Sequence, residues 1–188
     1  LKTRLGWDEN LMNAPDVARR AEAAGVRMIT IHGRTRCQFY KGQADWAAIR
    51  AVKEAVQVPV VANGDIVDAG TAARALEQSG ADGVMIGRGA QGQPWLLAQI
   101  AHRLWGHPAP EIPQGRALVD MVCGHYEAML GFYGADLGLR VARKHLGWYM
   151  DQAGTGPALR RAVLTGRDPK AVLRLLADAL DPQQQEAA

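Results

Sequence analysis

Glycine stands beside a charged or polar residue at the ends of three apolar segments. The three sequences are His32-Gly33-Arg34, Asn63-Gly64-Asp65 and Gly87-Arg88-Gly89. Glycine permits tight turns and a close approach of the backbone to a ligand, and a helix that follows such a turn favours a bound anion. The pattern indicates a phosphate site, with backbone N–H donors at Gly64, Gly87 and Arg88. The alternative interpretation is that these glycines only turn the chain.

Basic side chains and one histidine lie in the first two apolar segments and in the loop that follows the second segment. Lys2 and His32 both fall near strand ends, where their side chains would face the mouth of a barrel or crevice. Arg34 and Arg36 share one loop, and guanidinium groups suit the geometry of phosphate. The ordinary alternatives are an exposed terminal lysine and a structural histidine.

A second basic group lies late in the chain, in the sequence LGLRVARKHLGWYM. On a helix, Arg140 and Lys144 are one turn apart and Arg143 lies beside them, which predicts a basic ridge. Trp148 and Tyr149 would flank this ridge. A basic and aromatic surface of this kind can hold a phosphate backbone, whereas the alternative is a solvated helix face.

The elements that position these residues alternate between strand and helix over residues 1–105. We expect strands at 1–5, 28–33, 58–64 and 82–89, and helices at 14–24, 45–56 and 68–79. Asp45 and Asp68 stand where helix N-caps belong, and Gly25 and Gly80 stand where helices end. The strands are nearly all apolar, which predicts parallel strands that are buried on both faces. The fold class is therefore α/β, in which ligands bind at the carboxyl ends of the strands.

The pattern changes after residue 105. Residues 106–115 are rich in proline and glycine and read as a linker. Residues 116–181 show only helical periodicity, which predicts a small helical domain, and residues 182–188 form a polar tail. The expected helices are 116–131, 137–151, 157–165 and 169–180.

Composition narrows the class of protein. The chain has 188 residues, 48% of them hydrophobic and 22% charged, with a net charge of +3, as in an ordinary globular protein. Its two cysteines, Cys37 and Cys123, are far apart and form no CxxC motif, which argues against a disulfide scaffold or a structural zinc site and favours the cytoplasm. No apolar run reaches the ~18 residues of a membrane span. The chain opens without Met, inside a strand, so we expect it to be the C-terminal part of a longer protein.

Several segments together resemble the tRNA-dihydrouridine synthases, most closely the bacterial B-type branch. They are LKTRLGW, ITIHGRTRCQFYKGQADW, VPVVANGDI, GADGVMIGRGAQGQPWL and RVARKHLGWYM. The strings IHGRTR, ANGDI and MIGRGAQGQPW, in this order, are specific, and the resemblance covers essentially the whole chain. It implies an FMN-binding (β/α)8 barrel followed by a helical domain, of which this chain would hold strands 5–8 and the helical domain.

The resemblance also implies roles for particular residues. It places Lys2, His32, Asn63, Gly64, Asp65, Gly87 and Arg88 around FMN. It places Arg4, Arg34 and Arg36 near the substrate mouth, and Arg140, Arg143 and Lys144 on a helical tRNA clamp. The family reduces the C5=C6 bond of a uridine in tRNA with hydride from reduced flavin N5, and NADPH regenerates the flavin. Lys2 would stabilise the negative charge of the reduced ring.

One part of the family pattern has no counterpart in this sequence. The cysteine that donates a proton to the uracil lies upstream of the first residue here, and neither Cys37 nor Cys123 matches it. No catalytic residue is therefore assigned, and we expect the chain alone to be inactive. Half a barrel leaves two open edges, so we also expect it to require its missing half or a second copy. Two alternatives remain: another FMN-dependent, phosphate-binding barrel oxidoreductase, or an RNA-binding regulatory module with a vestigial half barrel.

Overall fold

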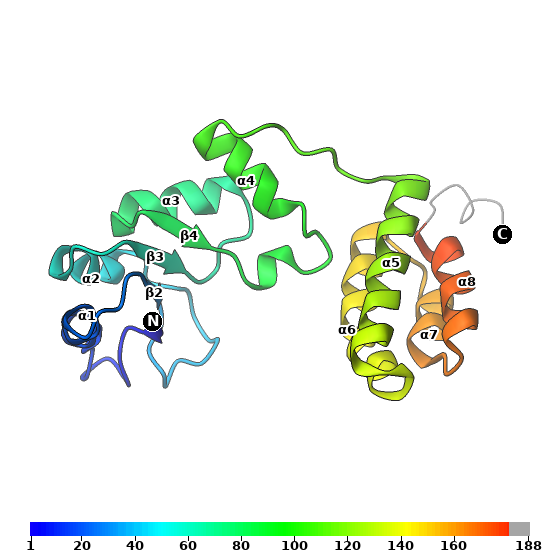
Figure 1. Cartoon of the computed structure of the whole chain (residues 1–188), viewed down its shortest axis with the longest axis horizontal. Coiled ribbons are helices and arrows are strands. Elements are labelled where there is room, and N and C mark those ends of the chain that lie inside the picture. Colours follow the sequence, from blue (N-terminus) through cyan, green and yellow to red (C-terminus); the bar gives the residue numbers. More distant parts are fainter. Residues whose placement is uncertain (181–188) are drawn as a thin grey trace. The chain divides into compact units, whose positions relative to one another are not determined.

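The computed structural model of the chain describes residues 1–180. These residues form two compact units, which are described separately. The first comprises Leu1–Ala90 and Trp95–Pro110, and the second comprises Gln91–Pro94 and the described residues from Glu111 on. Figure 1 labels most of the elements of both units. No helix within residues 1–180 is both long and apolar enough to cross a membrane.

The first unit is built on a four-stranded sheet. Its strands are β1 (Lys2–Arg4), β2 (Ile29–His32), β3 (Val60–Asn63) and β4 (Gly83–Met85). They lie in the order β1-β2-β3-β4, and every neighbouring pair is parallel. The register pairs the last residues of the strands with one another, so that Arg4, His32, Asn63 and Met85 form one row. The four predicted strands and their parallel direction are thereby confirmed.

Helices follow the strands, as expected for α/β architecture. They are α1 (Ala14–Ala23), the 3-10 turn η1 (Ala47–Ile49), α2 (Arg50–Ala55), α3 (Ala69–Ser79), the 3-10 turn η2 (Arg88–Ala90) and α4 (Leu96–Trp105). Asp68 caps α3 by accepting a 2.6 Å hydrogen bond from the Thr71 N–H, and Gly80 ends this helix in the left-handed conformation. The predicted cap and stop signals of α3 are therefore confirmed.

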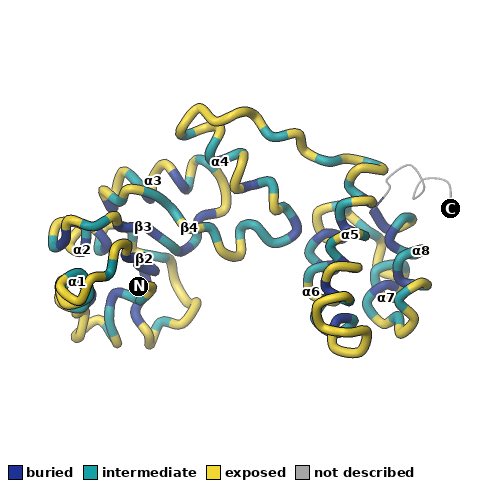
Figure 2. Tube along the Cα trace, in the orientation of Figure 1, coloured by how far each residue is buried: buried dark blue, intermediate teal, exposed yellow. Residues whose placement is uncertain are grey.

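Burial within the sheet is less complete than predicted. All four residues of β2 are buried, whereas β3 alternates between buried and half-buried residues. The residues of β1 and β4 are exposed or half-buried. Figure 2 colours the trace by burial and labels β2, β3 and β4. The expectation that all four strands are buried on both faces was wrong because β1 and β4 are the outer strands of this sheet within the described residues. The core of the unit centres on Ile29, Ile31, Val60, Ala62 and Ala18, each fully buried.

The second unit is helical. Its helices are α5 (Gly115–Tyr133), α6 (Ala135–Ala153), α7 (Pro157–Thr165) and α8 (Pro169–Leu180), close to the predicted ranges. Tyr126, Leu146, Met150 and Leu176 are at most 2% exposed and form the centre of its core. Gly138 allows α5 and α6 to pack closely, because a Cβ there would lie 2.9 Å from the Leu130 Cα. The predicted polar tail, 182–188, and residue 181 lie outside the described residues.

Candidate functional site

A cleft of about 710 Å3 opens at the carboxyl ends of the strands in the first unit. Its lining residues are Lys2, Arg4, His32, Tyr40, Asn63, Gly64, Asp65, Ile66, Val67, Gly87, Arg88 and Gly89. The row formed by the strand ends explains why residues so distant in sequence meet here. All seven residues expected around a cofactor line this cleft, which places them together but does not identify a ligand.

Lys2 reaches the cleft from an unexpected position. It is the first residue of β1, at the amino end of the strand rather than the carboxyl end. Side chains alternate along a strand, so Lys2 and Arg4 share a face, and both line the cleft. Arg4 also donates hydrogen bonds to the carbonyl oxygens of Thr35, at 2.7 Å, and Phe39, at 2.8 Å. The loop after β2 is thereby tied to β1.

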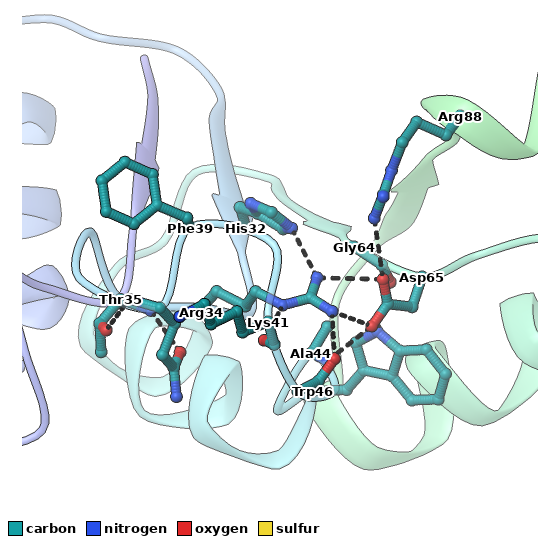
Figure 3. A network of polar contacts seen from close by, with 12 residues as sticks. His32, Arg34, Thr35, Phe39, Lys41, Ala44, Trp46, Gly64, Asp65 and Arg88 are labelled. Carbon is teal, nitrogen blue, oxygen red and sulfur yellow. Dashed lines mark hydrogen bonds and ion pairs between the residues drawn. The ribbon is translucent and has the colours of Figure 1, made fainter.

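Arg34 lies at the centre of a buried polar network (Figure 3). Only 1% of the residue is exposed, and its guanidinium forms a bidentate ion pair with the Asp65 carboxylate. Its Nε donates to the Lys41 carbonyl oxygen at 3.1 Å, and Nη2 donates to the Gly42 carbonyl oxygen at 2.8 Å. The expectation that Arg34 contacts RNA is corrected here, because a buried guanidinium whose donors bond to the protein is not offered to a substrate.

Asp65 is the acceptor that balances Arg34. Its Oδ2 accepts from Arg34 Nη2 at 2.6 Å and from the Ala44 N–H at 2.8 Å. Burial alone would raise the pKa of this carboxyl, but the hydrogen bonds from Arg34 and Ala44 prevail and hold the pKa below its ordinary value. An ionised carboxylate repels phosphate. The side chain of Asp65 therefore organises the turn, and any ligand contact at this position falls to the backbone.

The Asn63-Gly64-Asp65 turn requires glycine at its centre. Gly64 has a φ of 115°, and a Cβ there would lie 2.6 Å from His32 Cδ2 and 2.8 Å from the Ala44 Cβ. The Gly64 carbonyl accepts a 2.8 Å hydrogen bond from Trp46 Nε1. The Asn63 side-chain amide donates to the Met85 carbonyl at 2.8 Å, joining β3 to β4. The turn therefore places its own backbone beside the His32 ring and joins the ends of β3 and β4.

The mouth of the cleft carries arginines around an aromatic ring. Arg88 has a side chain that is 59% exposed and contacts Asp65 only at 3.5 Å. Its guanidinium lies 5.0 Å from the centre of the Tyr40 ring, and that of Arg4 lies 5.6 Å from the same ring. Sequence reasoning missed Tyr40, although its place in the aromatic and basic string RCQFYK was a usable signal.

His32 is held uncharged near neutral pH. Its pKa is lowered from 6.5 to about 4 by burial and by the positive charges of Arg4, Arg34 and Lys2, with Asp65 opposing them. The ring is therefore neutral, with one nitrogen that carries a proton and one that can accept a hydrogen bond.

Arg36 belongs to a different hollow of the first unit. A second cleft, of about 510 Å3, is lined by Thr3, Arg4, Gly6, Trp7, Leu11, Asn13, Val17 and Arg36. The exposed Arg36 guanidinium stacks 4.4 Å from the centre of the Phe39 ring. Arg4 lines both clefts, so two of the three arginines expected near the substrate mouth, Arg4 and Arg36, share this second cleft.

The basic ridge lies on α6 of the second unit. Arg140, Arg143 and Lys144 are exposed, in agreement with a surface ridge. Trp148 is half-buried, but Tyr149 is only 5% exposed, and its hydroxyl lies 3.2 Å from His125 Nδ1. Tyr149 is therefore a core residue and does not flank the ridge, because helical periodicity turns position 149 toward α5.

Comparisons with known proteins identify the family. The sequence model of the dihydrouridine synthase (Dus) family matches residues 1–185. The chain belongs to the dihydrouridine synthase family. It is 61% identical to a probable tRNA-dihydrouridine synthase of Rhodobacter capsulatus over 98% of this chain and 56% of that relative. It is 51% identical to a probable tRNA-dihydrouridine synthase of Rickettsia conorii over 95% of this chain and 54% of that relative.

A B-type relative is also similar. The chain is 46% identical to tRNA-dihydrouridine synthase B of Xanthomonas axonopodis pv. citri over 96% of this chain and 54% of that relative. The predicted resemblance to this family and to its B-type branch is confirmed. The chain spans about half the length of the curated relatives it matches.

Proposed function

We propose that this chain supplies strands 5–8 of an FMN-binding (β/α)8 barrel and the helical domain of a longer tRNA-dihydrouridine synthase, called the parent enzyme below. The sequential order β1-β2-β3-β4 with intervening helices supports half of such a barrel. The observation that carries the proposal is the basic cleft at the carboxyl ends of all four strands, where barrels of this type place their active sites.

The residues of the cleft fit a flavin mononucleotide. A volume of about 710 Å3 lies within the range of cofactor sites. Lys2, Arg4 and Arg88 outweigh the charge of Asp65, which Arg34 already balances. A Cβ at Gly87 would meet nothing within 4 Å, so the backbone there adjoins open space that a phosphate can enter. Gly87 and Arg88 would hold the phosphate, while Ile66 and Val67 add apolar surface.

FMN, when bound and reduced by NADPH, would supply the hydride for the C5=C6 bond of a uridine. Lys2 would favour the anionic form of the reduced ring through its charge. The uridine must leave the RNA stack, which costs a few kcal/mol. Phosphate contacts from Arg140, Arg143 and Lys144 on the helical unit would offset this cost in the complex with tRNA.

The proton donor is proposed to lie outside this chain. Cys37 is exposed and does not line the first cleft, and Cys123 lies in the helical unit. Burial and the negative charge of Glu127 and Asp120 raise the pKa of the Cys123 thiol. We therefore propose that the chain alone is inactive and requires its other half barrel or a second copy. The two unpaired cysteines accord with the cytoplasmic location that is part of this proposal.

The test compares the parent enzyme with a version that ends at residue 105. The parent enzyme should bind FMN, visible as flavin absorbance, and reduce tRNA with NADPH, whereas the shortened protein should lose tRNA affinity. Retained tRNA affinity would contradict the role of the helical unit and favour another FMN-dependent barrel oxidoreductase. A parent enzyme that binds tRNA but no flavin would favour an RNA-binding module. Dihydrouridine formation by the purified 188-residue chain would contradict the requirement for a second part.

A further inference from the structure

The orientation of His32 follows from its contact with Gly64. A Cβ at Gly64 would lie 2.6 Å from Cδ2 and 2.9 Å from Nε2 of the imidazole. The Nε2–Cδ2 edge of the ring therefore faces the turn after β3. The opposite edge carries Nδ1, which has no hydrogen-bond partner among residues 1–180, and the residue lines the first cleft.

The group that faces Nε2 is a donor that cannot accept. Arg34 Nη1 lies 3.3 Å from His32 Nε2. A guanidinium has five N–H donors and no acceptor, so this contact is a hydrogen bond only when Nε2 carries no proton. A proton on Nε2 would instead direct two donors at each other inside a buried network.

Arg34 has no freedom to turn away from the ring. Asp65 accepts from both Nη atoms, and the carbonyl oxygens of Lys41 and Gly42 accept from Nε and Nη2 (Figure 3). Together with His32, these acceptors account for all five N–H groups. The guanidinium is therefore fixed from the two segments that flank it, the loop after β2 and the turn after β3.

We propose that Arg34 is a positioning residue that fixes His32 with Nε2 as an acceptor and Nδ1–H as the donor presented to the ligand of the cleft. Such a donor suits a carbonyl, hydroxyl or phosphate oxygen. The assignment of the ring proton rests on this chain's geometry alone. The identification of the acceptor as an oxygen of FMN rests on the proposed function. The low pKa of His32 supports the same arrangement, because the neutral ring carries one proton whose place Arg34 decides.

The direct test is nitrogen-15 NMR of the histidine rings in the full 188-residue chain at pH 7. The signals of the His32 ring are identified as those that are missing from the spectrum of His32→Asn. The expected result is a protonated Nδ1 and an unprotonated Nε2. A protonated Nε2, or an even mixture of the two tautomers, would overturn the proposal. Arg34→Lys should shift His32 toward a mixture of tautomers, whereas Arg36→Lys, a matched change two residues away on the surface, should leave it unchanged. The unaltered chain decides the tautomer even where Arg34→Lys does not fold.

A second measurement separates this inference from the proposed function. In the parent enzyme, His32→Asn keeps an N–H donor near the position of Nδ1, whereas His32→Gln moves it toward the position of Nε2. The dissociation constant for FMN should rise about 10-fold more for His32→Gln than for His32→Asn, as for one lost hydrogen bond. An equal loss in both variants would overturn the assignment of the Nδ1 donor. Absence of FMN binding in the parent enzyme would overturn the proposed function and the identification of the ligand as FMN. The NMR experiment would still determine the tautomer of His32.

Discussion

Arg34 and Asp65 form a bidentate ion pair, with Nη2 2.6 Å from Oδ2 and Nη1 3.0 Å from Oδ1. The pair joins the loop after β2 to the turn after β3, and both segments line the cleft or support its walls. Paired guanidinium and carboxylate groups of this geometry hold position better than single hydrogen bonds do. The cleft therefore depends on an internal ion pair as well as on its exposed basic residues.

Loss of the Asp65 charge should destabilise the first unit. Asp65→Asn keeps the shape of the side chain, and Asn tolerates the φ of 53° at this position. It leaves the buried Arg34 charge uncompensated, so we expect the free energy of unfolding to fall by about 2–3 kcal/mol in urea denaturation, as for lost hydrogen bonds to a charged group. Asp120→Asn is the matched control, because its pair with Arg116 is exposed, and it should cost less than about 0.5 kcal/mol. Equal effects of the two changes would contradict a structural role for the buried pair.

A methyl group at Gly64 should distort the cleft. Gly64→Ala places a Cβ 2.6 Å from His32 Cδ2, and we expect a loss of about 2–3 kcal/mol of stability together with weaker FMN binding in the parent enzyme. Gly42→Ala is the control, because Gly42 also has a positive φ, 63°, but has open space around it. Thermal denaturation of both variants tests this, and a Gly64→Ala protein as stable as Gly42→Ala would contradict the close approach.

Acidification should weaken the first unit through His32. Its pKa is about 4 when folded and 6.5 in the ordinary state, so between these values the unfolded chain binds a proton that the folded chain does not. Stability should therefore fall as the pH falls through this window. From pH 7 to pH 5 the contribution of His32 should be about 2 kcal/mol. Urea denaturation gives the free energy of unfolding at each pH, and the difference between the two values should be smaller by this amount in His32→Asn. An unchanged difference would show that His32 is not held neutral.

The ridge on α6 should contribute to tRNA affinity without affecting the cleft. Replacing Arg140, Arg143 and Lys144 with alanine in the parent enzyme should weaken tRNA binding and reduce its dependence on salt, because fewer counterions are released. The matched control replaces three exposed arginines of the same unit, Arg161, Arg167 and Arg174. Filter-binding titrations at several salt concentrations make the comparison, with FMN absorbance expected to stay constant. An equal loss of tRNA affinity in both triple variants would indicate that binding depends on the net charge of the helical unit rather than on the ridge.

The sequence predicts the elements better than the burial of their side chains. Apolar strands and helix caps such as Asp68 are local signals, and they gave the order of strands and helices. The pairing of Arg34 with Asp65 is not local, since the two residues are brought together by the parallel register of β2 and β3. Sequence reasoning therefore treated Arg34 as an exposed phosphate contact and overlooked Tyr40. Tyr149 was misplaced because a short basic helix segment does not reveal which of two adjacent aromatic residues faces the core.

FMN binding by the first cleft is tested most directly at a residue that borders the open space of this cleft. Gly87→Val places a side chain where a Cβ meets nothing within 4 Å, so the fold should tolerate it while the cleft is filled. Gly83→Val is the control, since its Cβ position is equally open and Gly83 does not line the cleft. Fluorescence titration of FMN into the parent enzyme should give a dissociation constant at least about 10-fold higher for Gly87→Val and unchanged for Gly83→Val. Unaltered FMN affinity in a folded Gly87→Val enzyme would contradict FMN binding in the first cleft.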